Sequence, residues 1–255
     1  MYFDTPESHI FFEKRNWEIA SNDLPILFLH SALSTHREFD ILSQRYPNRK
    51  QIFLDYPAHG LSTTTNTNQT IYSLASCVRD VLLHEEIGHV DIIGYSMGGY
   101  VALELCKIAP SMVRSIVTHA TKFYWDEKSI EMSQAQLRTE VIKSRSERVY
   151  QILQTMHAEV GIENTFAANR SVVGNFAKEK LVEADIAKFG IPLLLSVGDR
   201  DNLVSLDEIT QLYTSQNPNT TSLAIHPNSP HQFSKLDMNS FTNAIRIFWK
   251  QLNNN

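Results

Sequence analysis

Short hydrophobic runs recur along the chain and alternate with longer amphipathic segments. The clearest runs cover residues 25–30, 51–56, 90–95, 115–120, 192–198 and 222–227. They are hydrophobic almost throughout rather than at every second position, which is typical of strands that are covered on both faces. The pattern therefore predicts buried parallel strands, while residues 9–20 resemble a short antiparallel pair at one edge of a sheet.

Between these runs, hydrophobic residues recur at helical spacing. The segment 71–88 has this pattern, with Thr70 placed to cap the helix and Gly88 placed to end it. The last helix is predicted to begin near Ser234, whose spacing to Asp237 resembles a capping box. Strands that alternate with helices predict an α/β protein with a doubly wound, mostly parallel sheet.

One interval interrupts the alternation. Residues 121–189 are charged and helical in pattern, without a convincing strand, and the chain returns to the sheet at residue 190. We expect residues 1–120 and 190–255 to form the core and 121–189 to form an inserted helical cap over the carboxyl edge of the sheet, where open α/β sheets bind ligands. The aromatic residues at 123–125 favour this interpretation over a surface decoration without function.

Composition narrows the class of protein. The 255 residues suffice for one domain with an insertion, and 42% hydrophobic and 20% charged residues without a biased tract predict a globular protein. The net charge of −5 and the scattered basic residues exclude the basic stripe that binds nucleic acid.

The two cysteines and the start of the chain bear on its location. Cys77 and Cys106 lie in helical hydrophobic patterns, which favours buried free thiols and a reducing compartment. The first residues do not have the pattern of a signal peptide, and no segment approaches the roughly 18 apolar residues of a membrane span. We expect a cytoplasmic protein, and the sequence does not indicate its oligomeric state.

The spacing Gly94-x-Ser96-x-Gly98 points to chemistry. It follows a predicted strand and opens a predicted helix that Pro110 ends. In such a sharp turn the serine has a strained backbone that exposes its hydroxyl, while glycines avoid clashes between strand and helix. The alternative, a purely structural turn, is less compatible with this strand and helix context, so Ser96 is the predicted nucleophile.

A serine hydroxyl needs a base, which a third group must orient. In the order serine, acid, histidine, the acid follows a late strand and the histidine follows the last one. Asp199 and Asp201 follow the run 192–198, and both are compatible with the acid. His226 ends the last run and can equally be a side chain on the sheet, so His231 in the following loop is the predicted base.

Taken together, these segments resemble the α/β-hydrolase superfamily over nearly the whole chain. Residues 55–62, "DYPAHGLS", are similar to its D-x-P-G-H-G-x-S segment, with Ala58 in place of a glycine. Its G-x-x-D-x-x-V pattern favours Asp201 as the acid and leaves Asp199 to shape the loop. Its G-H-aromatic segment supports His231, although Pro230 stands where the family often has glycine.

The same resemblance implies an oxyanion hole. One donor is the backbone N–H of Met97, which follows the nucleophile. The segment 30–34, "HSALS", is similar to the family's H-G-x-x-G loop and indicates the Ala32 N–H as the second donor. Ser31 replaces the usual glycine, so its side chain either changes the path of the loop or adds a hydroxyl near the site.

The resulting hypothesis is a carboxylesterase-like serine hydrolase with a catalytic triad of Ser96, Asp201 and His231, which acts on a small-molecule ester or acyl substrate. The sequence indicates neither a cofactor nor a metal, because it has no H-E-x-x-H motif, no cysteine cluster and no Walker lysine. The same site is compatible with carbon–carbon bond hydrolysis, with a lyase of the menaquinone-pathway type, and with a non-catalytic ligand receptor.

Basic residues in the pocket would favour polyanionic substrates and hence the lyase. The insertion holds four arginines whose orientation the sequence does not define: Arg138, Arg145, Arg148 and Arg170. Three other histidines, His30, His59 and His119, are expected to organise loops or to pack in the core, as are His157 and Met156 in the insertion. Of these, His119 also stands where it could line the pocket.

Overall fold

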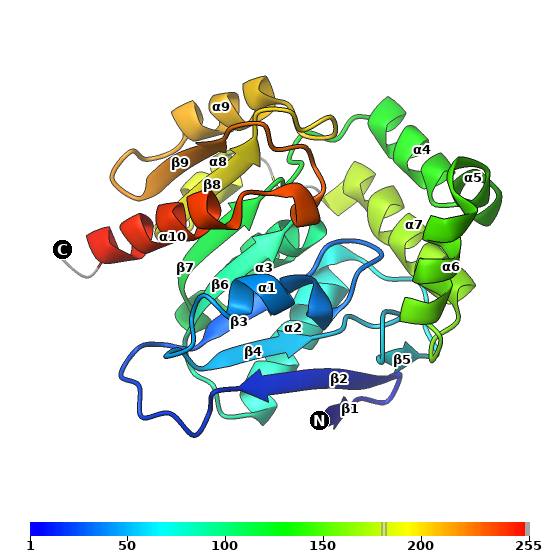
Figure 1. Ribbon diagram of the computed structural model, residues 1–255, viewed down its shortest axis with the longest axis horizontal. Helices are drawn as coiled ribbons and strands as arrows, with labels where there is room; N and C mark the ends of the chain where they lie inside the picture. Colours follow the sequence, from blue (N-terminus) through cyan, green and yellow to red (C-terminus); the bar gives the residue numbers. More distant parts are fainter. Residues whose placement is uncertain (180, 182, 253–255) are drawn as a thin grey trace.

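The computed structural model describes residues 1–179, 181 and 183–252. In this part of the chain the strands form one nine-stranded sheet in the order β1-β2-β4-β3-β6-β7-β8-β9, with β5 paired to β2 (Figure 1). The strands are β1 (Tyr2–Asp4), β2 (Ser8–Arg15), β3 (Ile26–Leu29), β4 (Gln51–Leu54), β5 (Thr63–Thr64), β6 (Val90–Tyr95), β7 (Val113–His119), β8 (Leu193–Gly198) and β9 (Thr221–His226).

Within the sheet, the pairings along β4-β3-β6-β7-β8-β9 are all parallel, as the unbroken hydrophobic runs predicted. The predicted antiparallel pair within residues 9–20 is wrong in its partners. β2 pairs with β1, which precedes it, and with β4 of the main sheet, while residues 16–20 form a turn and loop. Asn16, at a left-handed φ of 60°, begins that turn.

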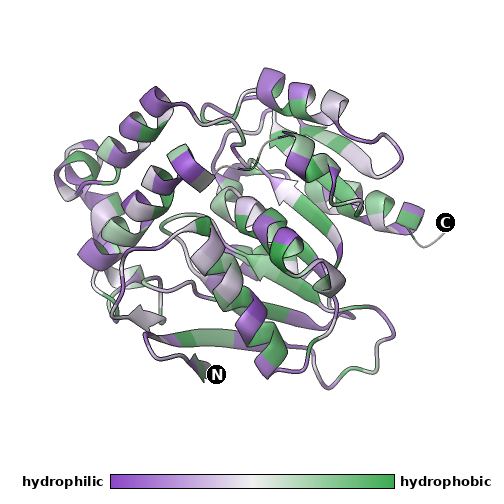
Figure 2. Ribbon diagram, turned by 180° about the vertical axis from the view of Figure 1, so that it is seen from behind, coloured by the Kyte–Doolittle hydropathy of each residue, from purple (hydrophilic) through white to green (hydrophobic). Residues whose placement is uncertain are grey.

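Helices cover both faces of the sheet. α2 and α3 cover one face, and α1 and α10 cover the other (Figures 1 and 2). Their side chains pack against buried residues of the central strands, which alternate between the two faces. The helices of the core are α1 (Asp40–Ser43), α2 (Ile71–His84), α3 (Met97–Ile108), α9 (Leu206–Ser215) and α10 (Met238–Leu252), and the 3₁₀ turns are η1 (His36–Phe39), η2 (Pro110–Met112) and η3 (Phe233–Lys235).

Two predicted helix ends are wrong. α2 begins after Thr70, whose side chain caps it as expected, but it ends at His84 and not at Gly88. Glu86 takes the left-handed conformation at φ 55°, and the N–H of Ile87 bonds to the Leu82 carbonyl, which is the Schellman arrangement that glycine usually occupies. Burial of the Ile87 side chain against the core accompanies this ending.

The last helix begins later than predicted. Ser234 lies in the 3₁₀ turn η3, and α10 begins at Met238. A carboxylate oxygen of Asp237 accepts the N–H groups of Asn239 and Ser240, so Asp237 is the capping residue itself. The hydrophobic face of α10 is buried as its pattern indicated.

Between β7 and β8 the chain leaves the sheet, and the described residues of 121–189 contain helices and no strand. Figure 1 shows α4 to α7 grouped beside the carboxyl ends of the central strands. The helices are α4 (Glu127–Gln136), α5 (Thr139–Arg145), α6 (Glu147–Met156), α7 (Ile162–Glu179) and α8 (Glu183–Ala187). Both cysteines, Cys77 in α2 and Cys106 in α3, are buried and unpaired, as predicted.

Candidate active site

Ser96 occupies the turn between β6 and α3, with backbone angles of φ 52° and ψ −115°. This left-handed conformation is unfavourable for a residue with a side chain. A Cβ atom on Gly98 would collide with the backbone of Leu29, and one on Gly94 would lie 2.5 Å from the backbone of Gly98. The two glycines therefore allow β3, β6 and α3 to meet closely behind Ser96.

The structure brings together the three side chains that the sequence indicated. Ser96 Oγ lies 3.4 Å from His231 Nε2, and His231 Nδ1 lies 2.8 Å from Asp201 Oδ2. The His231 side chain is 15% exposed and that of Asp201 is 1% exposed. A hydroxyl, an imidazole and a buried carboxylate are thus arranged in series, which is the geometry of an activated serine.

Asp201 is held as a carboxylate by its surroundings. Burial alone raises its pKa, but the hydrogen bond and charge of His231 and the N–H groups of Leu203 and Val204 outweigh burial, and the pKa lies below its ordinary value. Asp199 points elsewhere and accepts the Ser229 N–H at 3.2 Å. Of the two candidate acids, Asp201 is therefore the one beside the imidazole.

The loop that carries His231 is fixed from the nucleophile side. The Tyr95 hydroxyl, one residue before Ser96, donates to the His231 carbonyl oxygen at 2.6 Å. Gly198 at the end of β8 allows the backbone of Ser229 to approach closely, because a Cβ atom there would overlap the Ser229 carbonyl. Pro230 is accommodated between these two anchors.

His226 and His119 lie in a separate buried chain of hydrogen bonds. Ser196 Oγ is 2.9 Å from both His119 Nδ1 and His226 Nε2, and His226 Nδ1 is 2.9 Å from Ser240 Oγ. Burial lowers the pKa of His119 to about 3. His119 is buried and packs against Phe241 of α10, on the face of the sheet opposite α3, so it belongs to the core.

His30 fixes the orientation of the first peptide of the predicted oxyanion loop. Its Nδ1 is 2.7 Å from the Ser31 carbonyl oxygen, and its Nε2 accepts the Tyr56 N–H at 3.2 Å. Burial lowers the pKa of His30 to about 3, so the ring is neutral with its proton on Nδ1. Because a trans peptide directs its C=O and N–H in opposite directions, the Ala32 N–H points away from His30.

Neither of the two predicted donors has a hydrogen-bond acceptor within the described part of the chain. No acceptor is recorded there for the Ala32 N–H, and the Met97 N–H is in the first turn of α3, where an intrahelical acceptor is lacking. The N-terminus of α3 also favours negative charge at this position.

Glu38 explains the serine at position 31 and was not anticipated. The Ser31 N–H and hydroxyl donate to the two carboxylate oxygens of Glu38, each at 2.7 Å. The Ser31 side chain is thus bound to η1. Burial raises the pKa of Glu38 to about 7, which outweighs the opposing effects of hydrogen bonds from Ser31 and Ser34 and of the charge on His231.

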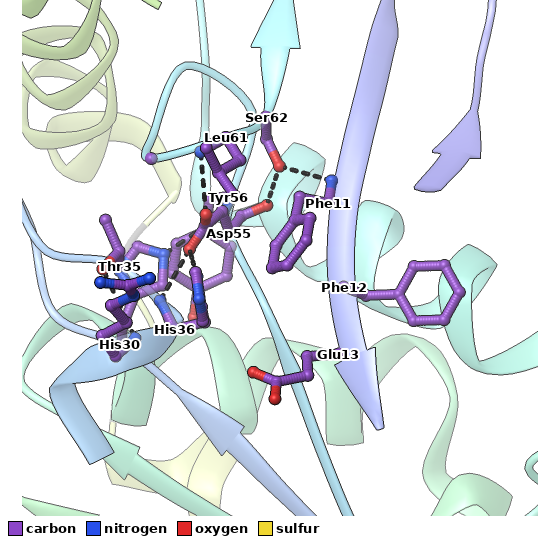
Figure 3. A network of polar contacts seen from close by, with 12 residues as sticks. Phe11, Phe12, Glu13, His30, Thr35, His36, Asp55, Tyr56, Leu61 and Ser62 are labelled. Atoms are coloured by element: carbon purple, nitrogen blue, oxygen red, sulfur yellow. Dashed lines mark hydrogen bonds and ion pairs between the residues drawn. The ribbon is translucent and has the colours of Figure 1, made fainter. Parts of the chain in front are cut away.

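A second carboxylate ties the loop after β3 to the turn after β4 (Figure 3). Asp55 is fully buried; its Oδ1 accepts the His36 N–H at 2.6 Å and lies 2.9 Å from His36 Nδ1, and its Oδ2 accepts the Leu61 N–H at 2.9 Å. Ser62 Oγ donates to the Asp55 carbonyl and accepts the Phe11 N–H. Burial raises the pKa of Asp55, but the hydrogen bond and charge of His36 contribute to a net decrease.

The inserted helices are joined to the same loops by two buried side chains. Asn169 of α7 donates to His59 Nε2 at 2.8 Å. His157, at the end of α6, accepts the Gly60 N–H on Nδ1 at 2.8 Å, and its Nε2 lies 3.1 Å from the Leu33 carbonyl oxygen. Sequence reasoning assigned His59 correctly to its turn but gave His157 no role beyond packing.

Two cavities lie where the insertion meets the core. One of about 750 Å³ is lined by residues 122–126, which include Phe123, Tyr124 and Trp125, and by side chains of α8 and α9. It begins directly after Thr121, whose hydroxyl donates to the Ser96 carbonyl at 2.9 Å. The other, of about 600 Å³, lies between α6 and the loops after β3 and β4.

The described residues contain no group of three or more histidine, cysteine, aspartate or glutamate side chains that could hold a metal ion. Among the same residues, no helix combines the length and hydrophobicity needed to span a bilayer.

The comparison with known proteins agrees with this geometry. The alpha/beta hydrolase fold family matches residues 25–158, and the chain belongs to that family. It is 28% identical over 111 residues to a protein of Mycoplasma genitalium named putative esterase/lipase 2, and the match covers 41% of each chain.

A second relative has a different name. The chain is 26% identical over 93 residues, 36% of each protein, to the 2-succinyl-6-hydroxy-2,4-cyclohexadiene-1-carboxylate synthase of Citrobacter koseri. Both matches span less than half of the relative's length. Among solved structures, a thermophilic esterase from Thermogutta terrifontis has the same fold, with a TM-score of 0.77 and 18% identity over 98% of this chain and 96% of the other.

Proposed function

We propose that the protein is a carboxylesterase-like serine hydrolase that cleaves small carboxylic esters through an acyl-enzyme on Ser96. The observation that carries the proposal is the series Ser96, His231 and Asp201, joined at 3.4 and 2.8 Å at a strained turn in front of a helix N-terminus. A buried carboxylate and an imidazole beside a serine hydroxyl serve to remove its proton.

In the first half of the reaction, Ser96 Oγ attacks the ester carbonyl carbon while His231 Nε2 takes the hydroxyl proton. Asp201 holds the imidazole through Nδ1–H and stabilises its charged form. The carbonyl oxygen becomes an oxyanion that the N–H groups of Met97 and Ala32 bind. The imidazolium then donates the proton to the leaving alkoxide, and the carbon–oxygen bond breaks to give alcohol and acyl-enzyme.

In the second half, water takes the place of the alcohol. His231 Nε2 accepts a proton from the water as its oxygen attacks the acyl carbon, and the same two N–H groups bind the second oxyanion. The proton returns to Ser96 Oγ as the acid leaves. No cofactor or metal takes part in these steps.

The inserted segment 121–189 is proposed to act as a cap. Of its arginines, Arg138 and Arg145 are exposed, and Arg170 donates to the Leu137 carbonyl oxygen. Arg148 lines the cavity between α6 and the loops after β3 and β4 together with Arg37, so lyase chemistry on a polyanionic substrate is the second candidate function.

Covalent labelling with a fluorophosphonate, followed by intact mass, tests the nucleophile. We expect one adduct on the wild type, none on Ser96→Ala, and strong loss on His231→Gln, whereas His226→Gln retains labelling because His226 is outside the triad. Turnover of p-nitrophenyl acetate and butyrate is measured on the same four proteins.

The outcomes separate the alternatives. Labelling with ester turnover supports the esterase. Labelling without turnover of any ester would contradict the esterase and favour carbon–carbon hydrolysis or lyase chemistry, and a folded protein that is not labelled would favour a receptor.

A further inference from the structure

The hydrogen bonds of His157 reach the loop that carries the Ala32 N–H. His157 is fully buried at the end of α6, 97 residues from Gly60 and 124 residues from Leu33 in sequence. Its Nδ1 accepts the Gly60 N–H, so Nε2 must carry the proton in the neutral ring and donate it to the Leu33 carbonyl oxygen. Burial lowers the pKa of His157, which favours this neutral form.

The Leu33 side chain is held by the same helices. It packs against a small hydrophobic cluster inside the insertion, formed by Tyr150, Ile162 and Phe166. Leu33 has a left-handed φ of 58°, which a residue with a branched side chain adopts only when its surroundings enforce it. The insertion therefore fixes both the side chain and the carbonyl oxygen of the residue that follows Ala32.

The two ends of the oxyanion loop are thus held by different parts of the chain. On the core side, Glu38 and His30 bind Ser31. On the other side, His157 and the hydrophobic cluster of the insertion bind Leu33. The position of the Ala32 N–H between these anchors depends on both.

We infer that His157 is a positioning residue of the oxyanion hole, through which the inserted helices control the placement of the Ala32 N–H. This inference rests on the proposed function, because it assigns the Ala32 N–H to the oxyanion. It differs from a role in general stability, since His157 supports the transition state through Leu33 and touches no substrate.

The decisive comparison is between two buried ties of the insertion. His157→Ala removes the bond to Leu33, and Asn169→Ala removes the tie of α7 to His59, whose side-chain hydrogen bonds go to Pro57 and Asn169 and not to residues 31–34. Loss of one oxyanion donor lowers kcat about 10²- to 10³-fold. We expect a displaced donor in His157→Ala to lower kcat about 10- to 100-fold with KM within about threefold, and Asn169→Ala to keep kcat within about threefold.

Two further variants test the same contact. His157→Gln retains an acceptor and a donor at similar reach, and it should restore kcat to within about fivefold of the wild type. Leu33→Ala weakens the hold from the loop side, and it should lower kcat as His157→Ala does. If His157→Ala does not fold, the kcat of Leu33→Ala tests the same contact.

A boronic acid, which forms a tetrahedral adduct with the serine, reports on the hole directly. Its affinity should fall in His157→Ala by about the same factor as kcat, whereas the affinity of the carboxylic acid product should change little. Equal effects of His157→Ala and Asn169→Ala, or no recovery in His157→Gln, would overturn the inference.

Hydrogen exchange separates this outcome from failure of the proposed function. If the wild type turns over no ester, the proposed function fails, but exchange at residues 31–35 still tests the positioning role. We expect faster exchange there in His157→Ala than in Asn169→Ala, and equal protection in the two variants would contradict it.

Discussion

Because of Glu38, the free energy of unfolding should decrease as the pH rises from about 4.5 to about 7. Its pKa is raised from 4.5 to about 7 in the folded protein, because burial disfavours the charged form. Between these two pH values the folded state binds more protons than the unfolded state, so the free energy of unfolding decreases with pH. A change of this size corresponds to about 3 kcal/mol, fully lost above the folded pKa.

Glu38→Gln removes this titration while keeping an oxygen that can accept from Ser31. Urea unfolding at pH 5 and pH 8 measures the effect, with the exposed Glu127→Gln as the matched control. The wild type and the control should lose about 2.5 kcal/mol more stability between the two pH values than Glu38→Gln does. Parallel pH profiles for all three proteins would refute the assignment of a raised pKa to Glu38.

Three other substitutions have defined outcomes. Asp201→Asn should lower kcat about 10³- to 10⁴-fold at unchanged melting temperature, while Asp199→Asn should lower it less than tenfold; equal losses would exclude Asp201 as the acid. Gly60→Ala should destabilise by more than about 2 kcal/mol in urea, because its Cβ would strike the Asp55 carboxylate, whereas Gly190→Ala, at a similar φ in open space, should cost about 1 kcal/mol. Asp91→Ala should cost about 3 kcal/mol, because it leaves two arginines without their buried carboxylate; a cost under 1 kcal/mol would contradict that role.

The parallel strands could be predicted from the sequence because strands buried on both faces are hydrophobic at nearly every position. The ends of the helices could not, because tertiary contacts decided them. Glu86 takes a glycine-like conformation so that Ile87 can reach the core, and Asp237 rather than Ser234 caps α10. The strand partners of β2 are likewise non-local and leave no local pattern.

The candidate site divides in the same way. Ser96 could be named from its glycine spacing between a strand and a helix, whereas the choices of Asp201 over Asp199 and of His231 over His226 also drew on the family resemblance; the structure brings the three side chains together. Glu38 and His157 contact the loop after β3 from a 3₁₀ turn and from the insertion. His157 binds backbone groups 97 and 124 residues away in sequence, Glu38 binds the N–H and hydroxyl of Ser31, and neither residue belongs to a motif.

Residues other than glycine and asparagine take left-handed conformations after the four adjacent strands β4, β3, β6 and β7: Ala58, Leu33, Ser96 and Ala120. Each is unfavourable by about 1–2 kcal/mol, a sizeable share of the 5–15 kcal/mol that usually separates folded from unfolded protein. On gradual heating, the turns that hold the reactive groups should therefore relax before the sheet melts, and inactivation should precede unfolding. Selection for heat resistance alone should relieve these turns first and should lower turnover as it does so.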